Sequence, residues 1–197
     1  MSYKEKLNDL IAENEGLILT RQLSEAGIPR VYLSNLVNDG LLVRLERGVY
    51  ITRNGYDDEL YRYQAKYEKA IYSHETALFL HDLTDRDPIN YSVTVPESYN
   101  ASHLRAYNFK VYSIKKSLYN LGLSESRTAF GRKVKCYNVE RTICDIVRHR
   151  NQIDIAVISD AIKRYAVRKD RNVPQLMRYA EKMRVAKIIR SYMEVVL

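Results

Sequence analysis

Five side chains between residues 30 and 38 have the chemistry that reads DNA bases, and their spacing places them on one side of a predicted helix. Leu33, Leu36 and Val37 fall on the other side of that helix, where they would face a core. An arginine can bond to guanine, and an asparagine amide can pair with adenine. The residues that we expect to contact DNA from this helix are Arg30, Val31, Ser34, Asn35 and Asn38.

A pair of arginines follows on a predicted hairpin. Residues 41–44 and 48–52 read as two short strands, with the turn at residues 45–47. Basic side chains on such a hairpin lie beside the helix, within reach of phosphates or of the minor groove. Arg44 and Arg47 are therefore the contacts that we expect from the hairpin.

These elements together have the order of a winged helix-turn-helix, with a helix, a turn, a second helix and a hairpin in residues 20–52. Thr20 is the expected N-cap of the first helix, because its hydroxyl can accept a free backbone N–H. Gly27 is expected to end that helix, and Pro29 suits the first turn of the next one. The same order also occurs in small modules that dock on other proteins, and this alternative stays open.

Length and composition suit one large or two small globular domains. The 197 residues are 46% hydrophobic, and no apolar run approaches the 18 residues or so that predict a transmembrane helix. The N-terminal residues lack a signal-peptide pattern, so we expect a cytoplasmic protein. Cys136 and Cys144 match no metal-ligand spacing and are expected to be buried thiols in a reducing compartment.

Charge is distributed unevenly along the chain, whose formal net charge is +8. Residues 1–52 have 6 basic and 7 acidic residues, whereas residues 101–197 have 21 basic and 8 acidic residues, a net charge of +13. A surplus of this size indicates a polyanion near the C-terminal half, which could be DNA beside the recognition site, RNA or an acidic protein. The basic residues singled out for this surface are Arg148, Arg150, Lys163, Arg164, Arg168 and Lys169.

The pattern of elements predicts the α+β fold class. After the winged helix, short strands are expected at residues 91–96, 109–114 and 132–137, and the chain reads as helical from Val139 onward. The second domain would thus combine a small β-sheet with a helical, basic C-terminus. The expected boundaries are a winged helix-turn-helix domain at residues 1–53, a connecting segment at 54–72 and a second domain at 73–197.

Motifs of catalysis are weak in this sequence. His74 and Glu75 do not begin a zinc-protease motif, because the next histidine is His81, and no phosphate-binding glycine motif occurs. Packing is the favoured role of these two histidines. His103 and His149 have no evident partner.

A metal-dependent nuclease would need converging carboxylates. Glu140 and Asp145 are the candidates in the basic half, but a separation of five residues does not place them on one helix face. We therefore expect no enzyme activity, no metal ion and no cofactor.

Four segments, taken in order, resemble the antitoxin of the AbiE abortive-infection system, known as the AbiEi family. They are the winged helix, YSHETALFLHDLTDRDP at residues 72–88, YSVTVPES at 91–98 and YNVERTICDIVRHR at 137–150. The second segment resembles the helix that opens the C-terminal domain in this family, and the third resembles the first central strand of that domain. The fourth resembles a strand-to-helix turn with an Arg-Thr pair and a following Asp. The resemblance covers roughly residues 3–150.

The resemblance implies a bacterial protein with two activities. The winged helix would repress its own operon by binding inverted repeats in the promoter, with two copies on the DNA and a monomer possible in solution. The C-terminal domain would counteract a cognate toxin of the nucleotidyltransferase type. Because the family is classed as type IV, no stable complex with the toxin is expected. The biological setting implied is defence against bacteriophage.

Two wider alternatives remain beside this interpretation. One is an ordinary transcription regulator whose second domain senses a ligand. The other is a nucleic-acid enzyme that a winged helix targets to DNA.

Overall fold

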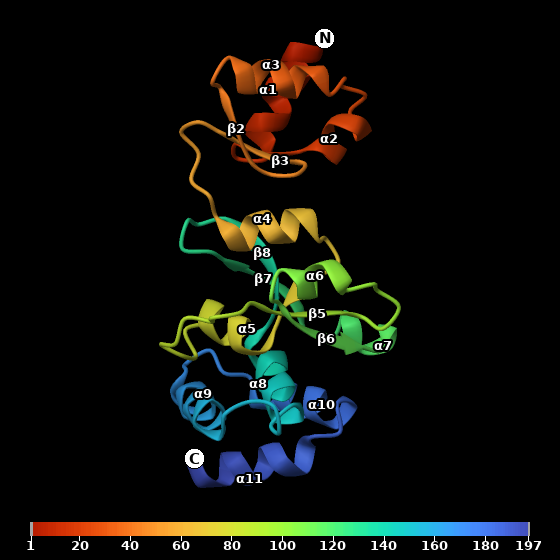
Figure 1. Cartoon of the computed structure of the whole chain (residues 1–197). Coiled ribbons are helices and arrows are strands. Elements are labelled where there is room, and N and C mark those ends of the chain that lie inside the picture. Colours follow the sequence, from red (N-terminus) through yellow and green to blue (C-terminus); the bar gives the residue numbers. More distant parts are fainter. Residues whose placement is uncertain (1, 197) are drawn as a thin grey trace. The chain divides into compact units, whose positions relative to one another are not determined.

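The computed structural model describes residues 2–196 and divides into two compact units, one up to Lys66 and the other from Tyr67 onward. Figure 1 draws both units. The first unit continues past residue 53, where the sequence placed the end of the first domain. The segment expected to connect two domains, residues 54–72, is instead shared between the two units.

The first unit combines helices with a three-stranded antiparallel sheet of strand order β1-β3-β2. Its helix pair and hairpin follow the predicted order, and α1, β1 and α4 complete the unit (Figure 1). The elements are α1 (Tyr3–Glu13), β1 (Leu17–Leu19), α2 (Thr20–Glu25), α3 (Val31–Asn38), β2 (Leu42–Glu46), β3 (Val49–Thr52) and α4 (Glu59–Lys66).

A small apolar core holds these elements together. Ser2 starts α1 with a capping box, in which its hydroxyl accepts from the Glu5 N–H and the Glu5 carboxylate accepts from the Ser2 N–H. Tyr32 of α3 turns toward α1, and its ring centroid lies 5.7 Å from that of Tyr3. The fully buried members of the core are Leu7, Ile18, Leu23, Ile28, Leu33 and Leu42.

Some local details differ from the sequence prediction. Thr20 is the first residue of α2 rather than its cap, because Leu19 precedes the helix and its N–H donates to the Gln22 side chain at 2.8 Å. Strand β2 extends to Glu46 through a bulge, so the turn of the hairpin is confined to Arg47 and Gly48. Gly48 has a φ of 81°, which a residue with a side chain rarely adopts.

Helix α4 is part of the first unit because it covers the outer side of the sheet. Its Tyr61 and Ala65 pack against a buried cluster formed by Leu17, Leu19 and Val49. Burying both sides of a three-stranded sheet removes more apolar surface from water than the winged helix could remove alone. The sequence prediction missed this role of the helix.

The second unit is built on a five-stranded mixed sheet of order β6-β5-β4-β8-β7. The β5–β6 and β4–β8 pairs are parallel, whereas β4–β5 and β7–β8 are antiparallel. The strands expected near residues 91–96, 109–114 and 132–137 are confirmed, and β4 and β7 were not predicted. The strands are β4 (Ile71–Tyr72), β5 (Ser92–Pro96), β6 (Lys110–Ile114), β7 (Leu123–Arg127) and β8 (Lys133–Tyr137).

The helical C-terminus is confirmed. Helices α8 to α11 lie together in the second unit (Figure 1). Leu78 and Leu83 from the region of α5 join these helices in one large apolar cluster, which includes Ile143, Ile158 and Leu176. The helices are α5 (His74–Leu80), α6 (Ser102–Ala106), α7 (Lys116–Tyr119), α8 (Val139–Arg148), α9 (Ile155–Val167), α10 (Val173–Lys182) and α11 (Ala186–Val196).

The α+β class, with small sheets and a helical C-terminus, is therefore confirmed. Cys136 and Cys144 are free, buried thiols, as expected. Between residues 2 and 196 no helix has the length and apolar character needed to cross a membrane.

Candidate nucleic-acid interface

The outer face of α3 is a stripe of exposed side chains. Val31, the first residue of the helix, is 57% exposed, and Arg30 precedes it as the N-cap residue. On the opposite face Leu33 is buried, and Leu36 and Val37 pack against the core. The helical repeat of 3.6 residues separates the two faces. The structure places at the exposed face all five residues expected from this helix, namely Arg30, Val31, Ser34, Asn35 and Asn38.

The hairpin presents both expected arginines to solvent. Arg44 lies in β2 beside the bulge, and its Nε donates to the Glu46 carbonyl at 3.3 Å. Arg47 occupies the two-residue tip with Gly48, and it is exposed. A third exposed arginine, Arg53, directly follows β3, and its N–H donates to the Leu41 carbonyl at 3.1 Å. Arg53 was not among the contacts predicted from the sequence, although its place directly after the hairpin was a usable signal.

Salt bridges from α4 neutralise the acidic group nearest these arginines. Glu46 accepts from Arg62 at 3.1 Å and from Lys66 at 2.5 Å. Arg62 is itself buried and also contacts Asp57 and Glu59. Glu46 therefore gives the hairpin little negative charge, because the Arg62 and Lys66 cations contact its carboxylate and offset it. The formal charge of residues 1–52 understates how positive the hairpin is.

The basic surface expected in the second unit is partly used inside the protein. Arg164 donates to Asp160 at 3.0 Å and to both carboxylate oxygens of Asp85, and it lowers the pKa of Asp85. Arg168 forms two hydrogen bonds of 2.9 Å with Asp170 and donates to the His81 carbonyl. These two arginines thus bind acidic or carbonyl partners of the same unit.

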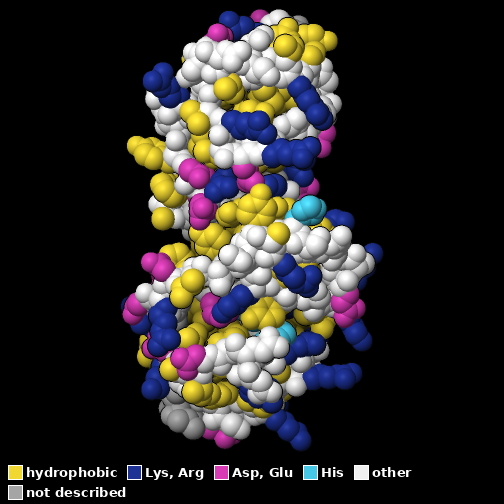
Figure 2. All heavy atoms as spheres, viewed as in Figure 1, with side chains coloured by type: hydrophobic (Ala, Val, Ile, Leu, Met, Phe, Trp, Pro, Cys, Tyr) yellow, Lys and Arg dark blue, Asp and Glu magenta, His cyan; other side chains and the backbone are white. Residues whose placement is uncertain are grey.

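The other four residues of that surface are exposed, and they are Arg148, Arg150, Lys163 and Lys169. Arg150 makes one long hydrogen bond of 3.3 Å to the Val147 carbonyl. Figure 2 shows basic side chains on the surface of both units, interspersed with acidic ones.

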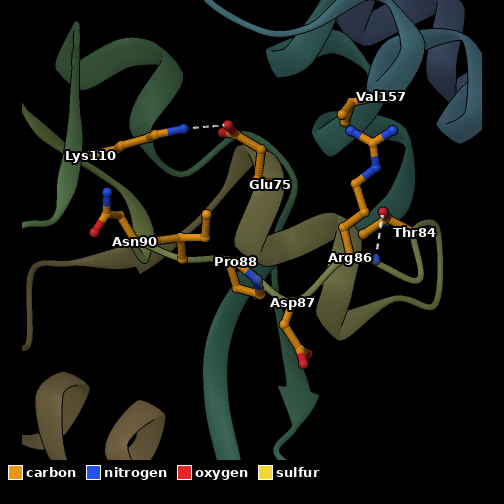
Figure 3. A pocket seen from close by; sticks show the side chains of 9 residues that line it. Glu75, Thr84, Arg86, Asp87, Pro88, Asn90, Lys110 and Val157 are labelled. Atoms are coloured by element: carbon orange, nitrogen blue, oxygen red, sulfur yellow. Dashed lines mark hydrogen bonds and ion pairs between the residues drawn. The ribbon is translucent and has the colours of Figure 1, made fainter.

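A hollow of about 230 Å³ opens beside the loop between α5 and β5. On one side Lys110 of β6 donates to Glu75 of α5 at 2.7 Å, and Asn90 lies next to them (Figure 3). Arg86 lies on the other side, near Val157 (Figure 3). The hollow therefore has charged groups at two ends and apolar lining between them, which suits a small polar molecule.

Two histidines that are 75 residues apart meet inside the second unit. Nε2 of His74 lies 2.9 Å from Nδ1 of His149, and Nδ1 of His74 lies 2.9 Å from the Ser73 hydroxyl. The Tyr112 ring stacks on His74 with its centroid 3.5 Å away. The expectation that His149 lacks a partner was wrong, because only the fold brings the two histidines together.

Both histidines are held in the neutral form. Burial lowers the pKa of His74 well below its usual value, and His149 and Arg141 lower it further. The pKa of His149 is also lowered, by burial and by Arg148 and Arg141, although its hydrogen bond to the Asp145 carbonyl opposes this.

The Arg-Thr-x-x-Asp segment of α8 has a structural role. Arg141 is completely buried and donates to the Asp145 carboxylate at 3.0 Å and to two carbonyls of residues 118 and 121 at 2.7 Å. Burial raises the pKa of Asp145 to about 6, although Arg141 opposes the shift. Glu140 accepts from the Asn172 N–H at 3.0 Å. These carboxylates bind partners in the fold, and within the described residues no group of three or more metal-ligating side chains gathers.

Most of the first unit matches a known protein family. Residues 5–52 match the family described as transcriptional regulator, AbiEi antitoxin. Over this range the first unit resembles the AbiEi antitoxin family. The matched range contains most of α1, the helix pair and the whole hairpin, and therefore all seven of the expected DNA contacts.

The second unit lies outside the matched range, and its fold is supported by a solved structure. The chain is similar to the RV2827C protein from Mycobacterium tuberculosis, with a TM-score of 0.60 and 14% sequence identity. The alignment covers 96% of this chain and 77% of the other. At this identity the similarity concerns the fold alone. No curated protein matches the sequence at a significant level.

Proposed function

We propose that this protein is an AbiEi-family autorepressor that binds inverted repeats in the promoter of its own operon. Its first unit would act as a winged helix-turn-helix, with α3 in the major groove and the hairpin beside it. The observation that supports this most directly is the exposed stripe on α3. Five side chains able to contact DNA lie on the one face of the helix that the core leaves free.

In this proposal the contacts divide by chemistry. Val31, Ser34, Asn35 and Asn38 would contact base edges, because their side chains are short and the helix can approach the groove floor closely. Arg44 and Arg47 would bind phosphates or the minor groove, and Arg30 would lie where the helix meets the backbone. An inverted repeat calls for two copies on the DNA, and each copy can be a monomer in solution.

The second proposed activity is that of an antitoxin. The second unit would counteract a cognate toxin of the nucleotidyltransferase type without a stable complex, as in type IV systems that defend against bacteriophage.

The exposed cations of the second unit would contact nucleic acid, either operator DNA or an RNA on which the toxin acts. They are Arg148, Arg150, Lys163 and Lys169. Operator DNA is the partner that we favour, since a first unit without net positive charge gains affinity from added phosphate contacts. Both activities would take place in the cytoplasm.

Fluorescence anisotropy of the full-length protein tests the first activity. The duplex upstream of its own coding region and a scrambled duplex of the same composition would be titrated at several salt concentrations. We expect tight binding that prefers the native duplex, and a simultaneous Arg44→Ala and Arg47→Ala change should weaken it and reduce the salt slope by about two. Equal affinity for both duplexes at every salt concentration would contradict sequence-specific regulation. The winged helix would then be a docking module.

One observation favours a second candidate function, a regulator that senses a ligand. The hollow beside Glu75 and Lys110 has the charged ends and apolar lining of a small-molecule site. Ligand binding there would have to change operator affinity. Thermal denaturation of the protein against a panel of amino acids and other small zwitterions tests this candidate, because a ligand that binds only the folded state raises the Tm. Replacing Lys110 with Met should abolish the increase, and no shift for any compound would remove the candidate.

A further inference from the structure

The chemistry of the α3 stripe is unusual for a DNA-binding face, because it contains little positive charge. Between Pro29 and Gly40 the only basic residue is Arg30, which precedes the helix. Guanine is read mainly by arginine or lysine, so this face can contact at most about one guanine in each half-site through a basic side chain.

An exposed valine begins the stripe. Val31 is 57% exposed and does not belong to the apolar core of the first unit. In the major groove an apolar side chain gains most by packing against the methyl group of thymine, which is the one apolar group that a base edge presents there. Val31 therefore favours thymine.

Two amides extend the same face. Asn35 lies one turn after Val31 and Asn38 lies nearly one turn further, so the three residues follow one edge of α3. Both asparagines are exposed. An asparagine amide matches the N6 donor and N7 acceptor of adenine, so both residues favour adenine over guanine.

The hairpin points to the same base composition independently. Its tip consists of Arg47 and Gly48, and the positive φ of Gly48 keeps the tip to two residues. A single arginine on a narrow tip suits a narrow minor groove, and runs of A·T pairs have the narrowest minor groove and the most negative potential.

From these features we infer that each half-site of the operator is rich in A·T pairs, with Val31 against a thymine methyl, Asn35 and Asn38 on adenines and Arg47 in a narrow minor groove. The inference rests on the proposed DNA-binding function and specifies the DNA that it reads.

Selection of duplexes from a randomised library by the full-length protein tests the base composition. We expect enriched half-sites dominated by A·T pairs. In the best duplex, each thymine would then be replaced in turn by deoxyuridine, which removes only the methyl group. For the wild-type protein one such replacement should weaken binding about fourfold, the effect of one buried methyl group.

Variants connect that effect to particular residues. Val31→Ala should bind the thymine duplex more weakly and should no longer respond to deoxyuridine at the same position. Val167→Ala, at an 80% exposed valine of the second unit, is the matched control and should respond as the wild type does. Asn35→Ala or Asn38→Ala should reduce the preference for A·T over G·C at one position about tenfold.

Different outcomes distinguish a failure of this inference from a failure of the proposed DNA-binding function. Enrichment of no sequence would overturn the proposed DNA-binding function. Enrichment of G·C-rich half-sites, or a response to deoxyuridine that Val31→Ala leaves unchanged, would overturn this inference while sequence-specific binding stands.

Discussion

Nε2 of His74 lies 2.9 Å from Nδ1 of His149, and this contact requires that the two imidazoles share one proton. A neutral pair satisfies every contact when His149 donates from Nδ1 and His74 donates from its own Nδ1 to the Ser73 hydroxyl. Thr94 of β5 donates to the same hydroxyl at 2.9 Å, so the chain of hydrogen bonds that begins at the two histidines extends to the sheet. His74 also has a φ of 49°, a conformation in which most side chains are strained. The pair therefore stabilises the junction of β4 and α5 only while both rings are neutral.

The first prediction concerns the pH dependence of stability. The pKa values of both histidines are lower in the folded protein than in the unfolded chain, so the unfolded chain takes up protons first as the pH falls. Their stabilisation should be complete above about pH 6.5 and should decrease below it. The loss for the buried His74 can reach about 1.4 kcal/mol per pH unit. Urea denaturation at pH 7.5, 6.5 and 5.5 measures it.

Two histidine variants test this pH dependence, and Asp145 has a pH dependence of the opposite sign. His74→Asn keeps a residue that tolerates positive φ and should flatten the pH dependence, whereas His103→Gln, at an exposed histidine of α6, should not. The raised pKa of Asp145 acts in the other direction, because its folded state binds a proton more readily between about pH 6 and pH 4. A free energy of unfolding that does not fall between pH 7.5 and 6 would contradict the assignment of a neutral pair.

The second prediction concerns the buried ion pair of α8. Asp145→Asn leaves the Arg141 guanidinium without a counterion in a fully buried position, and this should lower the free energy of unfolding by about 3–5 kcal/mol. Arg164→Met removes the exposed ion pairs with Asp160, at the same i, i+4 spacing, and with Asp85, and it should lower the free energy of unfolding much less. Guanidinium denaturation of the two variants compares them. Equal losses would mean that burial does not control the strength of these pairs.

The third prediction concerns the extent of the first unit. A fragment of residues 1–53 lacks α4 and would expose Leu17, Leu19 and Val49, so we expect it to be unfolded or poorly cooperative. A fragment of residues 1–66 keeps the helix and the salt bridges of Glu46 and should unfold cooperatively. Thermal denaturation followed by circular dichroism distinguishes them. A stable, cooperative 1–53 fragment would show that α4 is dispensable.

The fourth prediction concerns the basic surface of the second unit. Lys163→Glu combined with Lys169→Glu changes exposed cations, and we expect weaker operator binding with a salt slope reduced by about two. Arg164 and Arg168 are unsuitable for this test, because their replacement would also break the bonds to Asp85 and Asp170. Unchanged affinity and slope, with loss of protection from the toxin, would place this surface in antitoxicity.

The helix pair and hairpin of the first unit could be predicted from the sequence because their signals are local. The stripe from Val31 to Asn38 follows from the helical repeat, and Gly40 and Gly48 mark turns that need positive φ. Several strands and the helical C-terminus were also predicted correctly. The two-residue strand β4 was missed, since so short a segment has no periodicity of its own.

The sequence by itself determined which residues lie on the free face of α3 and on the hairpin, because neighbours within a few positions decide that. Only the tertiary structure decided that α4 completes the first unit, that Arg164 binds Asp85 and Arg168 the His81 carbonyl, and that His74 meets His149. Those contacts join residues that lie up to 87 positions apart. They form only when burial of apolar surface brings distant segments together, and no local spacing encodes which side chains will then face one another.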